Sequence, residues 1–257
     1  MVTDTSTKVG MTCEMVDLTG HGGTTINAYV ARPTGPGPFP AMVLIHHAPG
    51  WDEWYLEATR RFAQHGYAAI CPNLYARTGH GTSEEVGALV RAAGGVPDDQ
   101  VVSDLEAGFK YLRAQPYASG KVGIFGTCSG GRHAFLTAAR LGDQVDAVVE
   151  CWSGGVVQDE LTAMRPVSPH TLSDKVTAPI LGIFGNDDRN PTPEQVNAHE
   201  EELKRTGRNY EFHRYDGAPH GFFYYHAPAY RQESAVDGWK QIWEFLPKHL
   251  SKSQSKS

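Results

Sequence analysis

Gly126-Thr127-Cys128-Ser129-Gly130-Gly131 is the stretch of this sequence from which the fold can be inferred. A compact apolar run precedes it at 122–125, and a run of small residues with a helical pattern follows at 134–139. This order predicts a strand, a sharp turn and a helix, with the spacing of a nucleophile elbow that has a cysteine at its centre. The alternative is a glycine-rich turn with a buried structural cysteine, and the motif alone leaves both open.

The elbow has physical requirements that these residues meet. Glycines on both sides of the nucleophile relieve the crowding that so tight a turn creates. The start of the following helix supplies backbone N–H groups and a partial positive charge, which favour a thiolate and a developing oxyanion. A serine nucleophile at Ser129 is rejected, because position 127 is threonine and the G-x-S-x-G spacing fails.

Apolar runs alternate with helical patterns through the middle of the chain. Helices are predicted at 54–65, 83–93, 98–112, 193–206 and 231–248. Strands are predicted at 41–45, 68–71, 122–125, 145–149, 179–184 and 211–215, after two antiparallel strands at 12–18 and 24–31. The pattern predicts an α/β fold with a mostly parallel, doubly wound sheet and antiparallel N-terminal strands. No linker separates two cores, so residues 1–257 are expected to form a single domain with a disordered polar tail at 251–257.

Composition excludes several classes of function. The net charge of -6 argues against a nucleic-acid partner and against an anionic membrane surface, and no apolar run is long enough for a membrane span. The four cysteines show no C-x-x-C spacing, and no secretion signal is expected, so free thiols and a cytoplasmic location are expected. No metal or cofactor is expected, because His46, His47, His80 and His220 lack a regular ligand spacing.

Residues with catalytic chemistry come directly after predicted strands. In a parallel sheet these carboxyl ends meet at one edge, where ligands bind. An acyl-transfer site on such a sheet needs a nucleophile, an acid and a histidine in that chain order. Cys128, then Asp187 or Asp188, then His220 supply them. His220 would take the thiol proton, and the aspartate would orient the imidazole. Cys151, after the next strand, is interpreted as packing, with a place in the pocket as the alternative.

From about residue 28 to residue 250 the chain resembles the dienelactone hydrolase family, cysteine hydrolases of the α/β-hydrolase fold. The resemblance rests on Gly-Thr-Cys-Ser-Gly-Gly at 126–131, Pro-Asn-Leu-Tyr-Ala-Arg at 72–77 and Ala-Pro-His-Gly-Phe at 218–222. It implies that Cys128 is the nucleophile and His220 the base. The family's acid lies three residues after a glycine that closes a strand, which implies Asp188, with Asp187 as the alternative. The oxyanion hole would use the backbone N–H groups of Ser129 and Ala48.

Two departures from the family pattern concern the substrate. The family prototype has a glutamate where this chain has His47, preceded by His46. His47 could pair with the thiolate or the substrate, or it could be a loop histidine stacked on Trp51. The prototype also holds a substrate carboxylate with two arginines. One matches Arg77, which could instead be a structural ion-pair residue, and the other falls at Tyr224.

Together these features predict the contacts and the reaction. The expected substrate contacts are His46, His47, Trp51, Arg77, Phe222 and Tyr224. The aromatic run after His220 suggests a less anionic, bulkier or aromatic substrate than the prototype's small carboxylated lactone. The predicted function is hydrolysis of lactones or activated esters through a Cys-His-Asp triad and an acyl-enzyme, by a monomer or homodimer. The alternative is a non-catalytic ligand-binding protein with the same fold.

Overall fold

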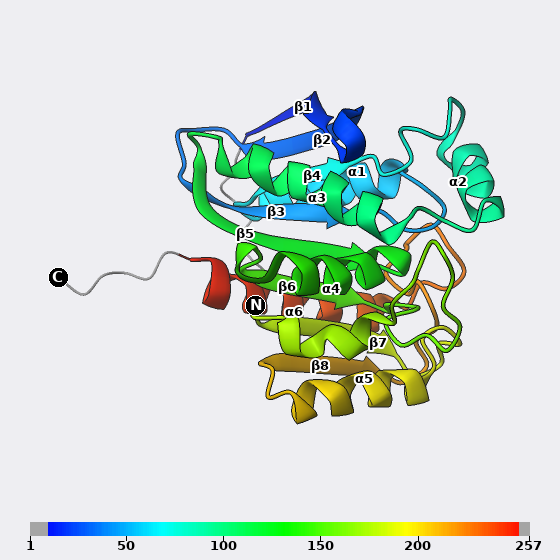
Figure 1. Cartoon of the computed structure of the whole chain (residues 1–257). Helices are drawn as coiled ribbons and strands as arrows, with labels where there is room; N and C mark the ends of the chain where they lie inside the picture. Colours follow the sequence, from blue (N-terminus) through cyan, green and yellow to red (C-terminus); the bar gives the residue numbers. More distant parts are fainter. Residues whose placement is uncertain (1–9, 252–257) are drawn as a thin grey trace.

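The computed structural model describes residues 10–251, and the predicted tail at 251–257 lies outside them except for Ser251. Eight strands form one sheet in the order β1-β2-β4-β3-β5-β6-β7-β8 (Figure 1). The strands are β1 Met11–Thr19, β2 Thr25–Pro33, β3 Phe39–Ile45, β4 Ala68–Pro72, β5 Ala118–Thr127, β6 Ala147–Cys151, β7 Ile180–Gly185 and β8 Tyr210–Tyr215. β1 and β2 pair antiparallel, β2 joins β4 antiparallel, and the strands from β3 to β8 run parallel.

Helices cover both faces of the sheet. They are α1 Glu53–Gln64, α2 Ser83–Ala92, α3 Asp98–Arg113, α4 Ser129–Leu141, α5 Pro193–Arg205 and α6 Gln232–Leu250, with short 3-10 turns at His21–Gly23, Gly142–Gln144 and Pro169–Lys175. One apolar cluster joins the sheet to α3, α4 and α5, and a second joins its other face to α1 and α6. The predicted α/β fold, with its doubly wound, mostly parallel sheet and antiparallel start, is therefore confirmed (Figure 1).

The parallel strands are apolar because they are covered on both sides. Every residue from Ala41 to Ile45 is fully buried, and so is each residue from Ile180 to Ile183 that carries a side chain. Such runs end abruptly where polar residues begin, and this places the polar residues at the carboxyl ends of the strands. These ends and the loops that follow them lie on the side of the sheet where α2 is found (Figure 1).

β5 holds the elbow near the middle of this edge. It pairs with β3 on one side and β6 on the other, so the residues after all three strands lie close together. None of the helices within residues 10–251 is long and apolar enough to span a membrane.

Candidate active site

Cys128 lies at the turn between β5 and α4 in a conformation that side chains rarely adopt. Its φ is 56° and its ψ is -126°, and its N–H donates to the carbonyl oxygen of Cys151 at 2.9 Å. The flanking glycines are required by close backbone contacts. A Cβ on Gly126 would lie 2.1 Å from the carbonyl oxygen of Gly130, and one on Gly130 would lie 2.2 Å from that of Ile45. The turn can therefore form only with glycine at both positions.

His220 is held by Asp188. Nδ1 of His220 lies 2.9 Å from Oδ2 of Asp188, whose side chain is buried and whose other oxygen accepts from the N–H of Asn190 at 2.8 Å. Asp187 instead accepts from the N–H of Gly217 at 3.2 Å. The structure thus brings Asp188, and not Asp187, to the histidine.

The charge state of His220 follows from its surroundings. Burial lowers the pKa of His220, but the hydrogen bond with Asp188 and the nearby Cys128 outweigh it and raise that pKa to about 10. The imidazole is therefore protonated at neutral pH, where it can stabilise a thiolate and donate a proton.

Trp152 supports the histidine from the end of β6. It is fully buried with a φ of 36°, and its ring meets that of His220 edge to face at 6.5 Å between centroids. Phe222 packs behind it, with ring centroids 5.0 Å apart and no exposed surface. The predicted contact between Phe222 and the substrate is therefore wrong, because this side chain belongs to the core. Cys151 is also fully buried, and burial raises the pKa of its thiol, which identifies it as packing.

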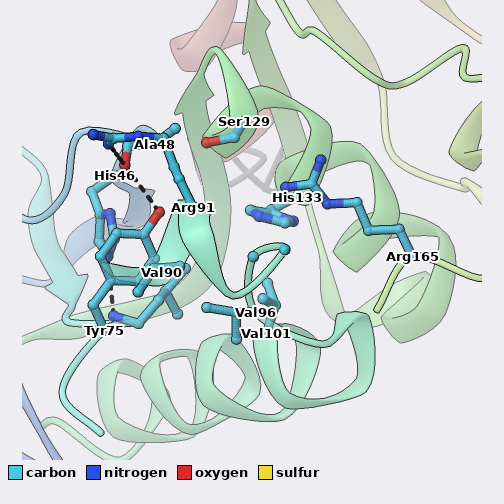
Figure 2. A pocket seen from close by; sticks show the side chains of 13 residues that line it. His46, Ala48, Tyr75, Val90, Arg91, Val96, Val101, Ser129, His133 and Arg165 are labelled. Carbon is cyan, nitrogen blue, oxygen red and sulfur yellow. Dashed lines mark hydrogen bonds between the residues drawn. The ribbon is translucent and has the colours of Figure 1, made fainter. Parts of the chain in front are cut away.

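Ser129 and Ala48 border one cavity of about 210 Å³ beside the elbow (Figure 2). Within residues 10–251 neither backbone N–H group has a hydrogen-bond acceptor. They are therefore free to donate, and their role as the oxyanion hole stays a prediction. Cys128 is half-buried next to this cavity. His220 borders a shallower depression of about 330 Å³, together with Asp188 and Arg189.

His47 is part of a buried chain of hydrogen bonds that ends next to the nucleophile. Its Nε2 lies 2.7 Å from Oδ2 of Asp52, and its Nδ1 lies 2.8 Å from the hydroxyl of Tyr224. The hydroxyl of Tyr224 is 2.6 Å from that of Thr127, which is 2.6 Å from the hydroxyl of Tyr55. Both ring nitrogens of His47 are therefore engaged. The expected pairing with thiolate or substrate and the alternative of stacking on Trp51 are both wrong.

Asp52 can only accept hydrogen bonds, so when His47 is neutral the donor and the acceptor of every hydrogen bond in this chain are determined. Asp52 accepts from Nε2–H of His47, so Nδ1 can only accept, and Tyr224 donates to it. Tyr224 then accepts from the hydroxyl of Thr127, which in turn accepts from Tyr55. Every hydroxyl is used, and the residue before Cys128 is fixed from both sides. Tyr224 thus positions the elbow, which replaces its predicted role as a substrate contact.

His46 has a structural role. Its Nδ1 donates to the carbonyl oxygen of His47 at 3.1 Å, and its Nε2 accepts from the N–H of Leu74 at 3.1 Å. The ring also packs edge to face on Tyr75, with centroids 4.5 Å apart. With both nitrogens in use, His46 can offer the substrate only the face of its ring, although it borders the cavity in Figure 2.

Burial of His46 makes the fold sensitive to acid. Burial lowers the pKa of His46 from 6.5 to about 4. The unfolded chain therefore takes up a proton at this residue between pH 6.5 and pH 4 that the folded chain does not. The contribution of His46 to the free energy of unfolding is fully present above pH 6.5 and is lost as the pH drops toward 4. The loss is about 3 kcal/mol, because one pKa unit corresponds to about 1.4 kcal/mol. Urea unfolding at pH 7 and pH 5 measures this effect. The free energy of unfolding should fall less between the two pH values in His46→Gln than in wild type. Equal losses would contradict this assignment.

Arg77 lies in an ion pair. Its guanidinium contacts the carboxylate of Asp104 at 2.6 and 3.0 Å and donates to the carbonyl oxygen of His21 at 3.1 Å. Asp104 is fully buried, so this pair ties the loop after β4 to α3. The structure supports the structural alternative for Arg77 over the predicted contact with a substrate carboxylate. Trp51 donates from Nε1 to the carbonyl oxygen of Cys71 at 3.1 Å and borders a separate pocket of about 400 Å³ with Tyr75 and His80.

Sequence reasoning missed several residues that shape the site. They are Asp52, Tyr55 and Thr127 in the buried chain and Tyr75, Arg91, His133 and Arg165 around the cavity. Thr127 could have been noticed, since it precedes the nucleophile. Arg165 comes from an irregular segment that no pattern places. Within residues 10–251, no three His, Cys, Asp or Glu side chains are grouped to bind a metal ion.

The sheet order, the helices on both of its faces and the sharp turn between β5 and α4 are those of the α/β-hydrolase fold. The chain belongs to the dienelactone hydrolase family, whose profile matches residues 26–250. A protein of Methylorubrum extorquens provisionally named a carboxymethylenebutenolidase is 34% identical over 224 residues, which are 86% of this chain and 76% of that protein. The carboxymethylenebutenolidase of Pseudomonas putida is 36% identical over 139 residues, which are 51% of this chain and 57% of that protein.

Solved structures agree with this assignment. The crystal structure of a Klebsiella pneumoniae protein provisionally named a dienelactone hydrolase superposes with a TM-score of 0.86 at 28% identity. The superposition covers 93% of this chain and all of the other. The expected family and its class of hydrolase are therefore confirmed.

Proposed function

We propose that this protein hydrolyses lactones or activated carboxylic esters with Cys128 as nucleophile, His220 as acid and base, and Asp188 as the residue that orients His220. The observation that carries the proposal is the 2.9 Å contact between Nδ1 of His220 and Asp188, which leaves Nε2 to face the reaction. Support also comes from the strained elbow at Cys128 and from family membership, since the Pseudomonas putida relative is a carboxymethylenebutenolidase.

The first half of the reaction forms an acyl-enzyme. The thiolate of Cys128 attacks the carbonyl carbon, and the oxyanion accepts hydrogen bonds from the N–H groups of Ser129 and Ala48. The carbon–oxygen bond then breaks, and the leaving oxygen takes a proton from Nε2 of His220. The raised pKa of His220 provides that proton at neutral pH. In a lactone the leaving oxygen stays attached to the acyl group.

The second half releases the acid. A water molecule gives a proton to Nε2 of His220 and attacks the thioester carbon. The oxyanion again uses Ser129 and Ala48, and collapse returns the thiolate of Cys128 beside protonated His220. Asp188 stabilises the imidazolium and keeps Nδ1 as the nitrogen that donates to it. Enol lactones and activated esters suit this chemistry because their leaving oxygens need little further assistance.

The test is a direct search for turnover and for the intermediate. Wild-type protein is mixed with 4-nitrophenyl acetate or with a dienelactone, and samples quenched within the first turnover are analysed by intact mass. We expect turnover of at least one substrate. We also expect one added acyl group per chain on Cys128, which is an acetyl group for 4-nitrophenyl acetate and the whole ring-opened molecule for the dienelactone. A His220→Ala variant should lose turnover. A protein that binds these compounds without hydrolysing them would instead support the ligand-binding alternative.

A further inference from the structure

A second pocket, of about 400 Å³, adjoins the cavity beside the elbow, and Tyr75 borders both (Figure 2). Its walls come from β2, from the loops after β3 and β4 and from the start of α2. The volume lies within the range of about 300–1,000 Å³ that is usual for small-molecule sites. The proposed reaction at Cys128 uses none of the residues that border this pocket, which we call the Trp51 pocket.

Trp51 presents a fixed aromatic ring to the Trp51 pocket. Its Nε1 donates to the carbonyl oxygen of Cys71 at 3.1 Å, and the half-buried side chain packs against the apolar cluster between the sheet and α1. Because the one polar group of the indole is used, the ring can offer a ligand only its apolar surface. An aromatic ring gains more from such a surface than an alkyl chain does, since ring pairs attract each other beyond the area that they bury.

The polar groups around this pocket can make further hydrogen bonds. Asn73 donates from Nδ2 to Oδ1 of Asn27 at 3.2 Å, and its own Oδ1 accepts from the N–H of Tyr75 at 3.0 Å. Among residues 10–251, Nδ2 of Asn27 and the hydroxyl of Ser83 have no partner. No lysine, arginine, aspartate or glutamate of the described residues borders the pocket, and the imidazole of His80, which does, is exposed to solvent. An uncharged ligand with a hydroxyl group therefore fits better than a charged one.

The position of the pocket in the sheet indicates which part of a substrate it meets. β5 leads to Cys128, and the sheet continues through β6, β7 and β8 on one side and through β3, β4 and β2 on the other. His220 follows β8 and, in the proposed reaction, protonates the leaving oxygen. The acyl group then extends to the other side, toward the loops after β3 and β4. The hydroxyl of Tyr75 donates to the carbonyl oxygen of Ala48 at 3.3 Å, so the pocket lies close to the proposed oxyanion hole.

We infer that the Trp51 pocket binds an aromatic ring with a hydroxyl group at the far end of the acyl group. Trp51 stacks on the ring, and Nδ2 of Asn27 donates to the hydroxyl oxygen. The inference rests on the proposed hydrolysis at Cys128 and names a substrate class for it, the esters of hydroxyphenylalkanoic acids. It gives the expected aromatic substrate a place at Trp51, whereas the aromatic run that suggested such a substrate is buried from Phe222 to Tyr224.

The test uses esters that share a leaving group and differ only in the acyl group. The panel holds the 4-nitrophenyl esters of hexanoic acid, of the phenylalkanoic acids from phenylacetic to 5-phenylpentanoic acid, and of their 4-hydroxyphenyl counterparts. The ring ratio is kcat/KM for a phenyl ester divided by kcat/KM for the hexanoate. The hydroxyl ratio is kcat/KM for a hydroxyphenyl ester divided by kcat/KM for the phenyl ester of the same length. In wild type both ratios should exceed one at the chain length that reaches the pocket.

Variants assign each ratio to one residue. Trp51→Ala should lower the ring ratio about 10-fold, and Trp51→Phe should keep part of it because phenylalanine retains a ring. Asn27→Ala should lower the hydroxyl ratio about 3- to 10-fold, as expected for one lost hydrogen bond, and leave the ring ratio near that of wild type. Trp243→Ala is the matched control and should change neither ratio. Trp243 is also half-buried, but it lies on α6 and stacks on His65, which precedes β4, with 3.8 Å between ring centroids.

The outcomes separate the pocket from the proposed function. If wild type hydrolyses 4-nitrophenyl acetate but its ring ratio is one or less at every chain length, or if Trp51→Ala keeps the wild-type ring ratio, the subsite is overturned while hydrolysis stands. A hydroxyl ratio that Asn27→Ala leaves unchanged overturns the role of Asn27. Circular dichroism recognises a variant that misfolds, and Trp51→Phe then decides in place of Trp51→Ala.

A binding measurement decides the pocket if the reaction fails. If wild type hydrolyses neither the panel nor 4-nitrophenyl acetate, the proposed function is wrong, and 4-ethylphenol is used as a neutral ring without an ester. Saturation-transfer NMR should then detect 4-ethylphenol on wild type and a weaker signal on Trp51→Ala. No signal on wild type, or equal signals on both proteins, would overturn the pocket as well.

Discussion

Cys128→Ala is expected to hydrolyse 4-nitrophenyl acetate at least about 1,000-fold more slowly than wild type, because it removes the atom that forms the acyl-enzyme. The fold should be kept, since alanine is smaller than cysteine and the backbone N–H still donates to Cys151. The positive φ at this position suits alanine no worse than cysteine. Release of 4-nitrophenolate measures the rate, and intact mass should show no acetyl adduct.

A buried cysteine away from the elbow provides the control for this prediction. Cys71 lies in β4 with no exposed surface, and burial raises the pKa of its thiol, which makes it unreactive. Cys71→Ala should therefore keep its turnover within about threefold, even though it removes buried volume from the core. Undiminished turnover by Cys128→Ala would rule out the covalent mechanism.

Asp188→Asn is expected to reduce kcat/KM by about 100-fold or more, while Asp187→Asn changes it by less than about threefold. The amide at 188 can still accept from the N–H of Asn190, so the loop should persist. It no longer stabilises the imidazolium, and it favours the wrong tautomer of His220. Because Asp188 is the first of the groups that raise the pKa of His220, the pKa on the alkaline side of the rate profile should also fall below about 10 in this variant.

The pair of variants is internally controlled. Asp187 and Asp188 are adjacent, both are aspartates and both accept a backbone N–H, but only Asp188 contacts His220. A general effect of removing negative charge from this loop would lower both activities equally. A large loss in Asp187→Asn with little change in Asp188→Asn would show that the assigned acid is wrong.

The sequence predicts the fold and the positions of the candidate catalytic residues because both depend on local patterns. A strand covered on both faces is an apolar run wherever it lies, and the elbow requires glycines at fixed spacing. Residues directly after such strands must meet at one edge of the sheet. Cys128 and His220 could be placed by this rule, whereas Asp188 was preferred to Asp187 only through the family resemblance, and the structure adds that the side chain of Asp188 points to His220.

The surroundings of the site could not be predicted in the same way. His47 and Tyr224 are 177 residues apart, and Thr127 and Tyr224 are 97 apart, so their contacts depend on how the loops after β3 and β8 pack against the end of β5. An arginine in a sequence also carries no sign of its partner. Arg77 is paired with Asp104, whereas no carboxylate within residues 10–251 pairs with Arg165, and only the packed structure distinguishes the two.

The pairing of His47 with Tyr224 restricts how this site can evolve. The family prototype has a glutamate and an arginine at the two matching positions, which is a different complementary pair. Glutamate at 47 alone would place a second carboxylate beside Asp52, and arginine at 224 alone would face a histidine with no anion to spare. Each single substitution would leave a poorly matched core, so we expect positions 47 and 224 to change together among members of the family.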